Sequence, residues 1–166
     1  MTVAAAPRPP LVLTLGEPAG VGPEIVVKAW QALAASGPAF VVLGDADVLK
    51  ASGAPVRQVL SAQDAEPVFS HALPIIPRPL PAPVTPGAPE PANAPAVADW
   101  IEEAVGLVLG GEASGVVTAP IAKAPLYAAG FRFPGHTEFI AELTADAPFP
   151  GVRGPVMMLT ARDLRA

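Results

Sequence analysis

The sequence predicts an α/β fold in which helices cover both faces of a mostly parallel sheet. Short apolar runs with β-branched residues, at 11–15, 40–43 and 115–119, are typical of buried strands. Segments with apolar residues at helical spacing separate these runs. A strand, a helix and a second strand within about 35 residues form a βαβ unit, whose two strands run parallel.

The composition narrows the class of protein. The chain has 166 residues, which is long enough to bury a real core. Apolar residues make up 51% and charged residues 15%, and this balance excludes a charge-driven disordered chain. The net charge of −5 and the absence of any Lys/Arg run predict no nucleic-acid partner. The negative net charge still allows a small anionic ligand, because one lysine and a few backbone N–H groups suffice to hold a phosphate.

The absence of cysteine excludes disulfides, thiolate catalysis and cysteine-based zinc sites. The start of the chain lacks a basic segment followed by a long apolar run, so we expect no signal peptide. No apolar run reaches the roughly 20 residues of a membrane span. We therefore expect a soluble, cytoplasmic protein with no membrane partner.

The first βαβ unit opens with a strand at 11–15. Residues 16–24 then form a tight loop rich in glycine and proline. A helix over 23–36 follows, because Pro23 suits a first helical turn and the helix dipole favours Glu24 there. The residues of this helix expected to pack on the sheet are Ile25, Val26, Ala29, Trp30 and Leu33.

The next section of the chain is less regular. Asp45 or Asp47 is expected to cap a short helix, and 56–60 is predicted as a weaker strand. Residues 73–76 are predicted as an edge strand, because proline cannot donate to a sheet ladder. The Pro-rich stretch at about 74–95 is either a flexible linker or an ordered surface crossover. We favour the crossover, since apolar residues remain interspersed and Gly/Ser runs are absent.

The remaining chain predicts one long helix, a third buried strand, two short helices, a loop at 146–155 and a last strand. Apart from that loop, their ranges in order are 93–109, 115–119, 123–129, 137–144 and 156–159. The positions expected to share the buried face of the long helix are Val97, Ile101, Ala104, Val105 and Val108. Phe139, Ile140 and Leu143 are expected to face inward from the second short helix.

Three loops at strand ends, where α/β proteins bind ligands, carry the candidate chemistry. The loop 16–24, which contains Gly16, Glu17 and Gly20, leads into a helix N-terminus, which favours an anion or a nucleotide. It contains neither a P-loop nor a Gly-x-Gly-x-x-Gly fingerprint, so a purely structural turn is an equally good interpretation. Lys123, just past another strand, either reaches a phosphate or is a solvated surface lysine.

The third loop is Gly135-His136-Thr137-Glu138. His136 suits donation to a phosphate or carboxylate, metal ligation, or acid–base chemistry near neutral pH. Thr137 offers a hydroxyl but is equally well placed to cap a helix. The three loops are expected to line one cleft from one side. Because a metal site needs several converging ligands and His71 is predicted to be structural, we expect no metal site in this chain.

These segments resemble the 4-hydroxythreonine-4-phosphate dehydrogenase family of pyridoxal 5′-phosphate biosynthesis. The resemblance rests on residues 16–24, 118–123 and 133–139, in the same order and at similar spacing, with 156–159 and 163–165 matching further on. It implies an isocitrate/isopropylmalate dehydrogenase-like fold, present here in incomplete form. It also implies a homodimer with sites at the subunit boundary.

The resemblance further implies an NAD- or NADP-dependent enzyme that oxidises 4-phosphohydroxy-L-threonine to a β-keto acid, which then decarboxylates. A divalent metal such as Zn, Mg or Co is implied as the Lewis acid. By this resemblance His136 and Thr137 bind the phosphorylated substrate, Lys123 lies in the same pocket, and the loop 16–24 lies near the cleft.

The resemblance covers only the N-terminal half of the family's sequence. We therefore expect residues 1–166 to be the N-terminal portion of a two-domain dehydrogenase and to be inactive alone. The metal ligands and most of the dinucleotide contacts are expected in the missing half. Two alternatives remain open: a sister-branch enzyme that oxidises 4-phosphothreonate or 4-phosphoerythronate, and a non-catalytic remnant that binds a phosphorylated ligand.

Overall fold

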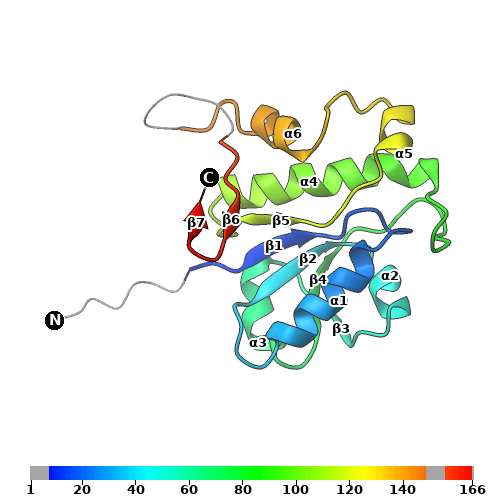
Figure 1. Ribbon diagram of the computed structural model, residues 1–166. Coiled ribbons are helices and arrows are strands. Elements are labelled where there is room, and N and C mark those ends of the chain that lie inside the picture. The colour runs from blue at the N-terminus through cyan, green and yellow to red at the C-terminus, as the bar shows by residue number, and fades with distance from the viewer. Residues whose placement is uncertain (1–7, 149–155, 166) are drawn as a thin grey trace. The chain divides into compact units, whose positions relative to one another are not determined.

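The computed structural model describes residues 8–148 and 156–165, and the chain divides into two compact units at Phe131 and Arg132. The first unit holds a five-stranded sheet with the order β3-β4-β2-β1-β5, in which every pair is parallel (Figure 1). This confirms the predicted α/β class. The strands are β1 (Leu11–Thr14), β2 (Phe40–Gly44), β3 (Val56–Gln58), β4 (Leu73–Pro77) and β5 (Val116–Thr118).

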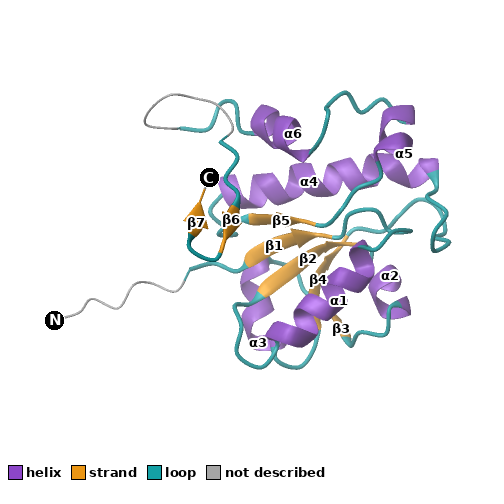
Figure 2. Cartoon of the chain, in the orientation of Figure 1, coloured by secondary structure: helices purple, strands orange, loops and turns teal. Residues whose placement is uncertain are grey.

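Helices of the first unit lie on both faces of this sheet (Figure 2). The β1–α1–β2 and β4–α4–β5 connections advance across the sheet in opposite directions, so right-handed crossovers place α1 and α4 on opposite faces. The α-helices are α1 (Gly22–Leu33), α2 (Ala46–Ala51), α3 (Glu66–Phe69), α4 (Ala94–Leu109) and α5 (Lys123–Ala128). Two 3₁₀ turns, η1 (Ala62–Ala65) and η2 (Pro91–Asn93), precede α3 and α4.

The buried face of α1 differs by one position from the predicted one. Ile25, expected in the core, is 43% exposed, whereas Val27 is 6% exposed. The cause is Trp30, whose indole Nε1 donates to the Phe69 carbonyl oxygen at 2.8 Å. This buried bond sets the rotation of the helix, so that Val26, Val27 and Trp30 face the sheet together.

The predicted buried face of α4 is confirmed except at Val108, which is half-buried. The buried members are Val97, Trp100, Ile101, Ala104 and Val105. The helix ends at Leu109 as predicted, and Gly111 then turns the chain with a φ of 76°.

The prediction that 73–76 is an edge strand is wrong, because β4 lies between β3 and β2. The amide of Arg78 donates to the Gly44 carbonyl of β2. The backbone N–H and C=O groups of even-numbered residues of β4 therefore point toward β2, and those of odd-numbered residues point toward β3. The nitrogen of Pro74 points toward β2 but precedes Ile75, the first residue of β4 that pairs with β2. The nitrogen of Pro77 points toward β3 but follows the last residue of β4 that pairs with β3. Neither missing N–H therefore breaks a ladder.

The strand predicted as buried at 115–119 forms β5, which pairs with β1 alone among the described strands. It lies at the edge of the sheet, and Val117 is 42% exposed. The apolar run is therefore typical of a strand but does not by itself indicate a central position.

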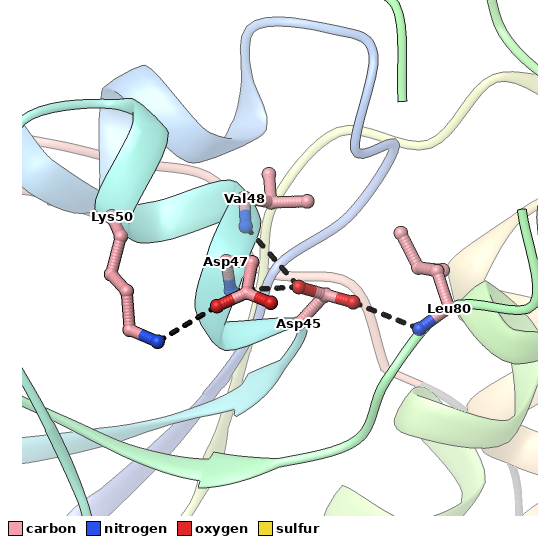
Figure 3. Close-up of polar contacts among 5 residues, drawn as sticks. All are labelled: Asp45, Asp47, Val48, Lys50 and Leu80. Carbon is pink, nitrogen blue, oxygen red and sulfur yellow. Dashed lines mark hydrogen bonds and ion pairs between the residues drawn. The ribbon is translucent and has the colours of Figure 1, made fainter. Parts of the chain in front are cut away.

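The Pro-rich crossover between β4 and α4 is held at several points. Asp45, which is the residue that caps α2, accepts the amide of Leu80 with its second carboxylate oxygen at 2.9 Å (Figure 3). The Asn93 side chain accepts the amide of Ala82 at 3.0 Å and donates to its carbonyl at 3.1 Å. Asn93 begins α4 as predicted, but its side chain does not cap the helix. These bonds give the crossover a defined path without regular secondary structure.

The second unit contains α6 (His136–Leu143) and the hairpin of β6 (Thr160–Ala161) and β7 (Leu164–Arg165). Phe139 is buried as expected, while Ile140 and Leu143 are half-buried.

The predicted strand at 156–159 is wrong, since pairing begins only at Thr160 and the four apolar residues before it are exposed. A strand needs a hydrogen-bonded neighbour, and the described residues provide none for this run. Most of the predicted loop 146–155 lies outside the described residues.

Across the described residues, no helix combines the length and apolar character required to cross a bilayer.

We predict that Gly22→Ala destabilises the first unit by about 1–3 kcal/mol, because an added Cβ would collide with the Leu15 carbonyl oxygen. The matched control is Gly106→Ala in the interior of α4, where an added Cβ meets no atom within 4 Å. That substitution should stabilise the protein by about 0.5–1 kcal/mol through backbone entropy. Urea unfolding followed by circular dichroism measures both, and equal effects would contradict the close packing at Gly22.

A second prediction concerns Thr14, whose side chain is fully buried and whose hydroxyl has no hydrogen-bond partner among the described residues. Thr14→Val should raise the free energy of unfolding by about 1 kcal/mol, because it removes an unsatisfied buried hydroxyl while keeping the shape. The control is Thr118→Val at the paired, half-buried position of β5, which we expect to be nearly neutral. A loss of stability in Thr14→Val alone would show that the hydroxyl has a partner in solution.

Candidate functional site

The candidate site lies where the chain leaves the carboxyl ends of β1 and β5. These strands are neighbours in the sheet, yet the elements that follow them lie on opposite faces. Helix α1 covers one face, while α5 packs against α4 on the other. In open α/β sheets such a divergence of two adjacent strand-end loops creates the crevice in which ligands bind.

A close backbone contact joins the two diverging loops. Gly16 adopts a φ of 72°, and an added Cβ would lie 2.5 Å from the carbonyl oxygen of Pro120. The next amide, that of Glu17, donates to this same oxygen at 2.9 Å. Glycine is needed at Gly16 both for its backbone conformation and for the close approach.

The loop after Gly16 folds back on itself. The Gly20 amide donates to the Glu17 carbonyl at 3.0 Å, and the Ala19 amide donates to Glu17 Oε1 at 3.1 Å. The Ala19 carbonyl in turn accepts the amide of Gly87 from the Pro-rich crossover at 2.7 Å. The loop is therefore fixed by its own turn, by the β5 loop and by the crossover.

The start of α1 is poorly suited to hold an anion. Pro23 has no amide hydrogen, and the Ile25 amide already donates to the Val21 carbonyl at 3.0 Å. Glu24 adds a negative charge in the first turn, and the Lys28 ammonium at 2.6 Å holds the pKa of this exposed carboxyl below its usual value. Of the two interpretations of the loop 16–24, the structure favours a shaped turn over an anion or nucleotide cradle.

Lys123 is the first residue of α5 and its side chain is exposed. It makes no ion pair within residues 8–148 and 156–165. Only two residues separate it from Pro120, which bonds to the cleft loop. Lys123 thus begins the helix that follows the β5 loop, shortly after the contact between Pro120 and the loop 16–24.

His136 and Thr137 belong to the second unit, where they are the first two residues of α6. Gly135 is the N-cap, so Thr137 is not the capping residue that one interpretation expected. Both side chains are half-buried. The rings of Phe133 and Phe139 pack with their centroids 5.0 Å apart and so brace the turn that presents His136.

The described residues do not gather the ligands of a metal ion by themselves. In the described part of the chain, no three His, Asp or Glu side chains converge. Two hollows contain none of the predicted site residues. One, of about 570 Å³, lies beside Arg8 and Ser114, and the other, of about 480 Å³, lies beside Asp47 and Val84.

The residue that sequence reasoning missed is Asn93. Its side-chain amide fixes the crossover by pairing with the backbone of Ala82, a contact between segments that no local pattern signals.

Known proteins match this chain along most of its length. Residues 36–166, which include Lys123, His136 and Thr137, match the family described as pyridoxal phosphate biosynthetic protein PdxA. The 4-hydroxythreonine-4-phosphate dehydrogenase of Caulobacter vibrioides is 58% identical over 159 residues, which are 95% of this chain and 48% of that protein. The chain thus spans about half the length of the curated relatives it matches.

Solved structures agree with these relatives. The 4-hydroxythreonine-4-phosphate dehydrogenase of Klebsiella pneumoniae has a TM-score of 0.73 and 33% identity, over 83% of this chain and 45% of its own. The enzyme of the same name from Burkholderia phymatum has a TM-score of 0.78 and 29% identity, over 96% of this chain and 48% of its own. With the predicted resemblance confirmed in both sequence and structure, the chain belongs to the PdxA family of pyridoxal phosphate biosynthetic proteins.

Proposed function

We propose that this chain is the N-terminal, substrate-binding part of a dehydrogenase that oxidises 4-hydroxythreonine 4-phosphate in pyridoxal 5′-phosphate biosynthesis. The observation that carries the proposal is the 58% identity to the Caulobacter vibrioides enzyme over 95% of the chain. The proposed reaction oxidises the secondary alcohol with NAD or NADP, and the resulting β-keto acid loses carbon dioxide. By the same proposal the complete enzyme is a cytoplasmic homodimer.

In this proposal the chain's own residues bind and orient the substrate. The Lys123 ammonium, exposed and without an ion-pair partner in the described part of the chain, suits the phosphate. His136 and Thr137 offer a ring N–H and a hydroxyl from the start of α6, where the helix dipole favours a negatively charged group. Donors of this kind fix a phosphorylated ligand without taking part in bond breaking.

The proposal assigns the hydride acceptor and the metal to a part of the relatives that this chain does not span. The described residues lack a three-ligand cluster, and the turn before α1 is unsuited to a pyrophosphate. A divalent metal, when bound, would supply Lewis-acid chemistry. The described residues fit neither a divalent metal nor a pyrophosphate.

We predict that residues 1–166 alone form no NADH from 4-hydroxythreonine 4-phosphate. A chimera that joins these residues to the C-terminal half of the Caulobacter vibrioides relative should form it, with that full-length relative as the positive control. The measurement is absorbance at the NADH band with NAD and a divalent metal present. A folded but inactive chimera would contradict the proposed function, and activity of residues 1–166 alone would contradict the assignment of the missing groups.

In the active chimera, Lys123→Ala should raise KM about tenfold, which corresponds to about 1.4 kcal/mol of lost substrate binding. The matched control is Lys28→Ala, an exposed lysine already paired with Glu24 and remote from the β5 loop in sequence. Initial rates at varied substrate concentration measure both variants. An unchanged KM in Lys123→Ala would assign this lysine to the solvated surface.

A further inference from the structure

Residues 83–92 of the Pro-rich crossover form a loop whose two ends are joined. The Asn93 side chain, which is 2% exposed, accepts the amide of Ala82 at 3.0 Å and donates to its carbonyl oxygen at 3.1 Å. All residues of the outer part of the loop, 85–92, are exposed. A segment with a fixed base and few buried contacts opens at a lower free energy than the sheet that it covers.

The tip of this loop is a tight turn. The Ala88 amide donates to the Thr85 carbonyl oxygen at 3.0 Å, and Gly87 has a φ of 79°. Proline at the second position and a glycine of positive φ at the third are typical of a type II turn. An added Cβ at Gly87 would meet no atom within 4 Å, so glycine is needed here for its backbone conformation alone.

One hydrogen bond holds this tip against the loop that follows β1. The Gly87 amide donates to the carbonyl oxygen of Ala19 at 2.7 Å. Within residues 8–148 and 156–165, it is the only hydrogen bond between 85–92 and a segment distant in sequence. A single neutral hydrogen bond contributes little net free energy, so the attachment of the tip is reversible while the sheet stays folded.

The bond from Gly87 reaches the middle of a turn in the loop 16–24. The Ala19 amide donates to Glu17 Oε1, and the Gly20 amide donates to the Glu17 carbonyl. The Glu17 amide is instead held by the Pro120 carbonyl on the β5 side. Loss of the bond from Gly87 therefore loosens the turn at Ala19 and Gly20 and leaves the backbone at Glu17 in place.

We propose that residues 83–92 are a flap that opens about its Ala82–Asn93 base, and that Gly87 is a positioning residue. In the closed flap its amide orders the turn at Ala19 and Gly20, and in the open flap this turn is released. The flap thereby controls the shape of the β1 side of the crevice. Because no ligand is needed to observe the opening, failure of this inference is separate from failure of the proposed function.

The test is native-state hydrogen exchange of the 166-residue chain, followed for each amide by NMR. In wild type the amides of Gly87, Ala19 and Gly20 should be about tenfold or more less protected than that of Leu15, which donates to β2. Gly87→Ala strains the turn and should speed exchange at Ala19 and Gly20 about fivefold to tenfold. Exchange at Glu17 and Leu15 should stay within about twofold of wild type.

The matched control is Gly53→Ala in the turn after α2. Gly53 has a φ of 84°, an added Cβ there also meets no atom within 4 Å, and its amide bonds to Lys50 instead of the loop 16–24. This variant should leave exchange at Ala19 and Gly20 within about twofold of wild type. Gly87→Asn should restore most of the protection that Gly87→Ala removes, because asparagine tolerates a positive φ.

Three results would overturn the role of Gly87. They are an unchanged exchange rate at Ala19 and Gly20 in Gly87→Ala, an equal increase in Gly53→Ala, and a Gly87→Asn variant as unprotected as Gly87→Ala. Equal protection of Gly87 and Leu15 in wild type would show that the flap does not open separately from the sheet. This last measurement decides the question even if Gly87→Ala does not fold.

Discussion

The contact between Gly16 and Pro120 is the constraint on which the site depends. The loops after β1 and β5 must separate toward opposite faces of the sheet, yet they touch at their first residues. Only a residue without a side chain, in a left-handed conformation, permits this approach. The same contact allows the Glu17 amide to reach the Pro120 carbonyl, and so it fixes where the Glu17 carboxylate and the start of the β5 loop lie.

The Pro-rich crossover holds the same loop from a second direction. Its Gly87 amide bonds to the Ala19 carbonyl, and the segment before it is tied to Asp45 and Asn93. The Arg78 guanidinium also makes two bonds to the Glu103 carboxylate on α4. A loop whose backbone polar groups are bonded within its own turn and to two other segments loses little further entropy when a ligand binds, which favours a preorganised site.

The sequence predicted those parts of the fold that depend on local patterns. The β1–α1–β2 unit and the length of α4 follow from apolar periodicity and from glycine and proline at element ends. The place of β4 in the sheet did not follow, because the effect of Pro74 and Pro77 depends on the register with both neighbours. The burial of Glu17 was equally out of reach, since it arises from a contact with Pro120, about 100 residues away in the chain.

The charged side chains around the β1/β5 crevice differ in sign between its two sides. The β1 side carries the buried Glu17 and, at the start of α1, the acidic Glu24 with no free amide at Pro23. A phosphate placed there would meet negative charge and few donors, whereas the β5 side offers the exposed Lys123. Because like charges repel and opposite charges attract, an anionic group on a ligand is favoured on the β5 side of the crevice and disfavoured on the β1 side.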